Sequence, residues 1–142
     1  MRSVQKGFSL IEVMIAVLVL SGAMMAMAYL QVLGLRNANS AYMRSQATML
    51  AYDIVDRMRA NRAGAPNYAL LISAATPVAD TTVATADKID WRNSIADTLP
   101  NGAGGVEINA GVAAVTITWY DNSQDATNAQ PQTQTYTYST RL

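Results

Sequence analysis

Near its N-terminus the chain reads Lys6-Gly7-Phe8-Ser9-Leu10-Ile11-Glu12-Val13, and a long apolar run follows. No charged residue occurs from Val13 to Leu35. This run and the apolar residues just before it exceed the roughly 20 residues that a helix needs to span a bilayer. Arg2 and Lys6 lie before the run, and basic residues favour the cytoplasmic side of a membrane helix. The sequence therefore predicts one membrane helix beginning at Phe8, with a cytoplasmic N-terminus and the rest of the chain on the opposite side of the membrane.

Glu12 is the only charged residue in the predicted membrane helix, residues 8–35. A carboxylate in a spanning helix costs on the order of 2–3 kcal/mol on insertion scales. Glu12 either lies at the level of the lipid headgroups, where it stays ionised, or pairs with a cation from another subunit. Cleavage after Gly7 would create such a cation, the amino group of Phe8. Within one helix this amine and Glu12 lie one turn apart, so neighbouring staggered helices could pair them between subunits.

Two other interpretations of the N-terminus remain open. A secretory signal peptide is cut after its apolar region, next to small residues, and Ala26 and Ala28 offer such a site. The chain continues with helical character beyond Ala28, which favours a retained helix. An anchor that is never processed is the second alternative. A short leader, residues 1–7, that is removed before Phe8 explains the basic residues and Gly7 together.

The composition of the 142-residue chain excludes most catalytic chemistry. There is no cysteine and no histidine, so the common zinc sites, Cys–His pairs and Ser–His–Asp triads are absent from the sequence. The formal net charge is zero, which gives no bulk basic field for nucleic acid. We expect a protein that is not an enzyme, with no catalytic residue, cofactor or metal site and no direct contact with nucleic acid.

One pattern remains as a possible cation site. Asp121, Ser123 and Asp125 stand at alternate positions, like the opening of a calcium loop. The glycine and the distal glutamate of such a loop are absent. The pattern therefore indicates a solvated loop between two strands, and calcium binding is left to a direct test.

The predicted helix continues beyond the membrane through residues 36–63, without a proline before Pro66. Apolar residues at steps of three or four form one stripe: Met43, Ala47, Leu50, Ile54 and Met58. A globular domain must cover this stripe. Three cations suit the negative end of the helix dipole: Arg57, Arg59 and Arg62. They therefore indicate the end of the helix, and a binding patch is the second interpretation. Gly64 and Pro66 then supply a stop signal.

The sequence predicts that residues 64–142 form a globular head domain. Residues 65–86 read as a connecting loop, and a short helix at about 87–99 follows, with Asp87 as its N-cap. The segment 101–105 is rich in glycine and predicts a flexible turn. From Val106 the hydrophobic period changes to two, which predicts two to four antiparallel strands. The fold class is therefore α+β, a long N-terminal helix packed on a small antiparallel C-terminal sheet.

The stretch Gly7-Phe8-Ser9-Leu10-Ile11-Glu12-Val13 resembles the processing and methylation site of type IV prepilins and of type II secretion pseudopilins. The resemblance implies that a prepilin peptidase cuts after Gly7 and methylates the amino group of Phe8. It also implies that Glu12 guides the docking of the subunit during assembly. A pilin-like fold is implied as well.

Further segments resemble the PilV family of minor pilins: 40–47, 51–61, Asp90-Trp91-Arg92 and 115–119. This resemblance implies a minor subunit that supports assembly or initiation of a type IV pilus, and with it motility, adhesion or DNA uptake. The implied partners are other minor and major pilins, the prepilin peptidase and the inner-membrane assembly machinery. The implied location is the inner membrane and then the pilus filament.

Two other functions compete with this hypothesis. A minor pseudopilin of a type II secretion system shares every feature of the first 35 residues. A membrane-anchored periplasmic binding domain would have a different mature N-terminus, so mass spectrometry of that terminus separates it from a pilin.

Overall fold

The structure is a computed structural model and describes residues 7–121 and 132–142 of the chain. The described residues fall into two compact units, one that ends at Arg36 and one from Asn37 to Leu142. Helix α1, Leu10–Ala60, contributes its first part to one unit and its second part to the other. The two units are described one at a time.

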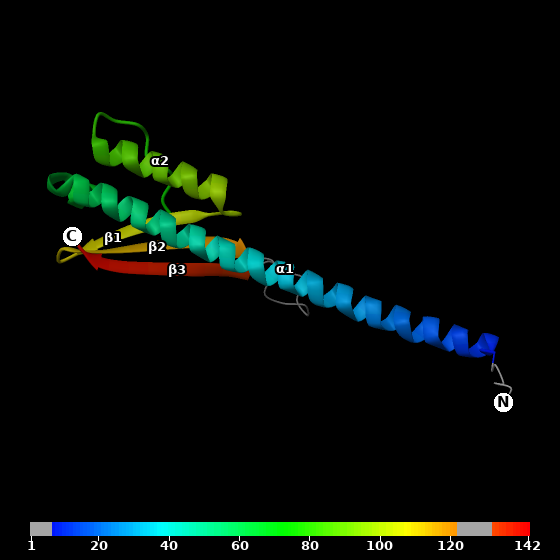
Figure 1. Ribbon diagram of the computed structural model, residues 1–142. Coiled ribbons are helices and arrows are strands. Elements are labelled where there is room, and N and C mark those ends of the chain that lie inside the picture. Colours follow the sequence, from blue (N-terminus) through cyan, green and yellow to red (C-terminus); the bar gives the residue numbers. More distant parts are fainter. Residues whose placement is uncertain (1–6, 122–131) are drawn as a thin grey trace. The chain divides into compact units, whose positions relative to one another are not determined.

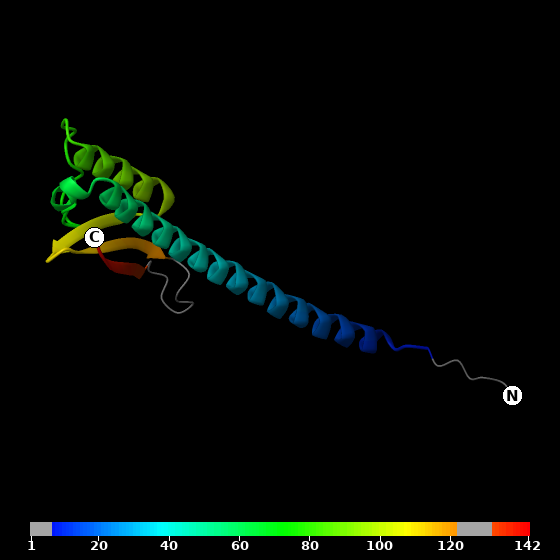
Figure 2. The ribbon, with the colours of Figure 1, turned by 60° about the vertical axis from the view of Figure 1, so that its left-hand side comes forward.

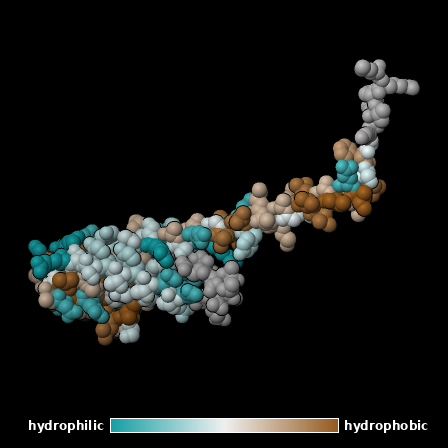
Figure 3. Space-filling view, turned by 90° about the horizontal axis from the view of Figure 1, so that it is seen from below, coloured by the Kyte–Doolittle hydropathy of each residue, from teal (hydrophilic) through white to brown (hydrophobic). Residues whose placement is uncertain are grey.

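The first unit is the N-terminal part of α1 and the residues just before it. Leucine, alanine and methionine favour a helix here, and no proline interrupts it. The most apolar window of α1 has a mean hydropathy of 2.3, and none of it is buried. Figure 3 shows the brown, hydrophobic surface that this part of the chain presents. By length and composition, the helix can therefore cross a membrane.

The second unit combines helices with a three-stranded sheet. After α1 come a 3-10 helix η1, Arg62–Tyr68, and helix α2, Val83–Thr98. The strands are β1, Ala103–Asn109, β2, Val112–Asp121, and β3, Gln132–Arg141. They form one antiparallel sheet in the order β1-β2-β3. In Figures 1 and 2 the second part of α1 lies along the sheet with α2 beside it. The predicted α+β fold, a long helix with a small antiparallel sheet, is confirmed.

The predicted stripe on the outer half of α1 is the centre of the core. Met43, Ala47, Ile54 and Met58 are buried, and Leu50 packs against them while partly exposed. The same core receives inward-facing residues of α2, its C-cap Leu99 and residues of β2: Trp91, Ile95, Leu99, Ala113, Val115, Ile117 and Trp119. One side of the sheet is thus covered by helices.

A tight hairpin joins β1 to β2. Ala110 and Gly111 both have positive φ angles, 50° and 77°, as the two central residues of a type I′ turn require. The register is continuous, and it pairs Val106 with Val115 and Val115 with Tyr138.

The hydrogen-bond direction of each strand residue follows from the sheet register. Val106 exchanges backbone hydrogen bonds of 2.8 and 2.9 Å with Leu70, so its polar backbone faces away from β2. In an antiparallel ladder, two paired residues either exchange backbone hydrogen bonds or both point them away from each other. Val115, the partner of Val106, therefore bonds toward β3. Tyr138, the partner of Val115 in β3, bonds toward β2. The even-numbered residues of β3 therefore bond to β2. The odd-numbered ones face an edge that is unpaired among the described residues.

The helix predicted at about 87–99 begins earlier than expected. Helix α2 starts at Val83, and its N-cap is Thr82, whose side chain accepts a hydrogen bond from the Thr85 amide. Asp87, the expected N-cap, lies inside the helix. Its carboxylate accepts hydrogen bonds from Tyr68 and from Arg57, at 3.1 Å for Arg57. A tertiary network, which the local sequence does not reveal, therefore explains this aspartate.

The prediction of a flexible turn at 101–105 was wrong for its second half, because β1 begins at Ala103. A Cβ atom on Gly104 would lie 2.4 Å from Ile95 and 2.6 Å from Trp91. On Gly105 it would lie 2.8 Å from the Ile72 amide. These glycines allow close packing on both faces of a strand, and flexibility is not their role.

The end of α1 and the segment after it also differ from expectation. The α-helix ends at Ala60, before the expected residue 63, and η1 occupies the start of the predicted loop. Arg92 holds residues 71–74 of that loop by donating to the carbonyls of Leu71 and Ala74, and it also donates to the Gly104 carbonyl of β1. Burial of this guanidinium lowers the pKa of Arg92 from its ordinary value.

Candidate processing and assembly site

The Gly7–Phe8 peptide bond lies before the helix and is accessible. Helix α1 begins at Leu10, and the Ser9 carbonyl accepts hydrogen bonds from the amides of Glu12, at 3.0 Å, and Val13, at 3.3 Å. Phe8 is 84% exposed. A peptidase that must bind an extended chain would thus meet no regular structure at this bond.

The fold of this chain gives no packing reason for glycine at position 7. A Cβ atom built on Gly7 would meet nothing within 4 Å. At Gly104, by contrast, a Cβ would overlap two buried side chains. A requirement for a small residue at Gly7 would therefore come from another protein, which is what a cleavage site needs.

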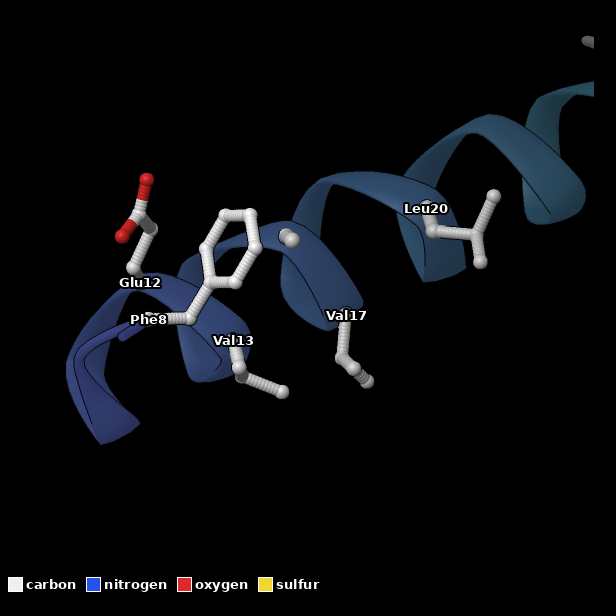
Figure 4. Close-up of a pocket in the computed structure, with 6 residues that line it drawn as sticks. Phe8, Glu12, Val13, Val17 and Leu20 are labelled. Carbon is white, nitrogen blue, oxygen red and sulfur yellow. The ribbon is translucent and has the colours of Figure 1, made fainter. Parts of the chain in front are cut away.

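Glu12 lies in the first turn of α1, beside Phe8 (Figure 4). A shallow pocket on this part of α1 is lined by Phe8, Glu12, Val13, Ala16, Val17 and Leu20. Apart from the carboxylate, the lining is apolar. The first turn of a helix favours a negative side chain through the helix dipole, by about 0.3–1 kcal/mol. Glu12 therefore has a local structural reason to stand there, besides any role in docking.

A second local reason for Glu12 was not predicted from the sequence. Ser9 and Glu12 stand at the first and last positions of an S-x-x-E pattern, which is typical of a capping box. The spacing of these two residues was the available signal. The hydrogen bonds found at this helix start join backbone atoms. The pattern agrees with the observed start of α1 at Leu10, which leaves Gly7 and Phe8 outside the helix.

Glu12 has no ion-pair partner in the described part of its unit, residues 7–36. The one cation there is Arg36, at the opposite end of the segment. Three ion pairs occur in the described chain, and all of them lie in the second unit. The Glu12 carboxylate is thus available to a cation supplied from outside this segment.

Of the predicted calcium pattern, only Asp121 belongs to the described residues. It is 1% exposed and accepts a hydrogen bond from the Ser40 hydroxyl. Ser123 and Asp125 lie outside the described residues. In the described ranges no group of three or more acidic side chains could hold a metal ion.

Two family models match the chain. Residues 29–90 match the family described as Type IV pilin Tt1218, and residues 2–29 match the one described as Prokaryotic N-terminal methylation motif. No curated protein and no solved structure matches. Together with the long helix and the small antiparallel sheet, the two matches support a type IV pilin subunit. Such a subunit implies assembly with other pilins and processing by a peptidase.

Proposed function

We propose that the chain is a minor pilin of a type IV pilus, similar to the PilV family. Residues 1–7 are a leader, and residues 8–35 are a membrane and assembly helix. Residues 36–63 continue the helix along the head, and residues 64–142 complete the periplasmic domain. The inner membrane holds the subunit through one helix, with the N-terminus in the cytoplasm, until the subunit enters the filament.

The observation that carries this proposal is the arrangement at the start of α1. An exposed peptide bond after Gly7 precedes an apolar, unburied helix. The Glu12 carboxylate, one turn into this helix, has no ion-pair partner within residues 7–36. A bare apolar helix is unfavourable in water, at about 25 cal/mol per Å² of exposed apolar surface. It needs lipid or the helices of other subunits around it. Assembly replaces the lipid around the helix with the helices of other subunits.

The roles of the three site residues follow from this exchange. Cleavage after Gly7 creates a positive amine at Phe8, which the peptidase methylates. The Glu12 carboxylate accepts a hydrogen bond from that amine of a neighbouring subunit while the helix leaves the lipid. A charge-assisted hydrogen bond in such surroundings contributes about 1.5–3 kcal/mol. This contact selects the axial position of the incoming subunit.

Intact mass spectrometry of the membrane-bound protein tests the processing. We expect a mature chain that begins at Phe8 and carries one added methyl group. Gly7→Val should leave the leader attached, whereas Gly22→Ala, a change within the helix, should be processed normally. A chain that keeps Met1, or one that begins near residue 28, would refute the proposal.

A minor pseudopilin of a type II secretion system is the second candidate, because residues 2–29 match a motif that the two systems share. The absence of cysteine favours a minor over a major subunit, since the C-terminal disulfide loop common in major pilins cannot form. It does not separate a minor pilin from a minor pseudopilin. Deletion of the gene should abolish or reduce surface pili and leave protein secretion intact. The reverse result would assign the chain to secretion.

A further inference from the structure

Three arginines from separate elements line one open pocket in the second unit. Arg59 comes from the last turn of α1, Arg62 from the start of η1 and Arg141 from the end of β3. Leu142 completes the lining, and the cavity measures about 490 Å³. The sequence reasoning placed Arg59 and Arg62 at a helix end. The fold adds Arg141, which is distant in the sequence.

The positive charge of this pocket exceeds the negative charge that balances it, because three guanidinium groups face the Asp56 side chain and the α-carboxylate of Leu142. Arg59 donates to the Asp56 carboxylate at 3.1 Å and to the Thr140 hydroxyl at 3.2 Å. Within residues 7–121 and 132–142, the guanidinium groups of Arg62 and Arg141 have no hydrogen-bond or ion-pair partner. Like charges held near one another repel, so an anion in the pocket would stabilise the arrangement.

Two further acidic side chains of this unit, Asp53 of α1 and Asp87 of α2, are already engaged, because both bind Arg57 at 3.1 Å. Neither of them lines the pocket. The helix dipole accounts for Arg59, which lies in the last turn of α1, and for Arg62, which follows that turn. It does not account for Arg141, which belongs to a strand.

The geometry points to a phosphate-bearing ligand. One arginine fork satisfies a planar carboxylate, whereas a tetrahedral phosphate presents oxygens in several directions and can accept from two or three guanidinium groups. Arg59 is held in place by Asp56 and Thr140, so part of the site is ordered before binding. Among the residues that the structure describes, no aromatic side chain lines the pocket, so recognition rests on the phosphate alone. We propose that Arg59, Arg62 and Arg141 bind phosphate groups, free or linked in a polymer.

The test is calorimetric titration of the full chain in non-ionic detergent with orthophosphate and, separately, with tripolyphosphate, at constant ionic strength. Arg62→Gln and Arg141→Gln should each weaken binding about tenfold, the effect of losing one charged hydrogen bond. The matched control is Arg44→Gln, which removes one positive charge from α1 away from the pocket. It should bind like the parent chain. Tighter binding of tripolyphosphate would indicate a polymeric source, and equal binding a free phosphate.

Three results would overturn the proposal. They are absence of binding by either probe, equal weakening in Arg44→Gln, and equal or tighter binding of a pentaglutamate peptide. Arg62→Lys keeps the charge but loses the fork, so its affinity should fall between those of the parent and Arg62→Gln. Far-UV circular dichroism of each variant confirms that the head is folded. The titration does not require a processed N-terminus, so it stands apart from the proposed function.

Discussion

Replacing Glu12 tests whether its carboxylate serves assembly or only the start of the helix. Glu12→Gln keeps the size and removes the charge, whereas Glu12→Ala removes the side chain. Insertion into the membrane should become easier, since a carboxylate in a spanning helix costs on the order of 2–3 kcal/mol. Assembly should suffer, because a charge-assisted contact of about 1.5–3 kcal/mol is lost, which corresponds to a 10- to 150-fold weaker association.

The assay follows two pools of the same subunit. Membrane fractionation measures insertion, and immunoblotting of sheared pili measures incorporation. We expect normal membrane levels and at least about tenfold less incorporation for both variants. Glu107→Gln is the matched control, because it removes an exposed carboxylate from β1, within the head.

The outcome separates the two roles of Glu12. If only the helix dipole and the capping pattern matter, the loss is about 0.3–1 kcal/mol, and neither pool should change much. Normal incorporation of Glu12→Gln would therefore refute pairing between subunits. Equal loss of both pools would show that the residue serves stability in the membrane and would refute the argument as well.

Three further predictions concern the head. Gly104→Ala should lower its unfolding free energy by about 1–3 kcal/mol, since the new methyl group overlaps buried Ile95 and Trp91, and chemical denaturation measures this. Gln134→Pro should destabilise the head more than Thr135→Pro in the same assay, because the Gln134 amide bonds toward β2 and the Thr135 amide faces the open edge; equal losses would contradict the deduced strand direction. Burial and the Asp87 carboxylate raise the pKa of Tyr68, so the neutral phenol is favoured in the fold, and stability should fall above about pH 10, an effect that Tyr68→Phe should reduce in pH-dependent denaturation.

The long-range pattern of the head could be predicted because burial follows periodicity. The stripe on α1 and the alternation of β2 both place apolar side chains on one face, and the structure confirms them. The predictions that were wrong rested on local sequence signals. Asp87 and Gly104 each carry a strong local signal, for a helix start and for a turn. Tertiary contacts, with Arg57 and Tyr68 in one case and with Trp91 in the other, gave both residues a different role.

The two candidate sites also differ in whether the local sequence or the fold brings their residues together. Gly7, Phe8 and Glu12 lie close together in the sequence and contact little else in the chain, so spacing alone brings them together. The arginine pocket depends on the register of β3, which places Arg141 opposite Val112, near the hairpin turn. No local pattern predicts that register without the fold. A candidate site whose residues are close in the sequence can thus be predicted from the sequence, whereas a candidate site built across elements requires the folded head.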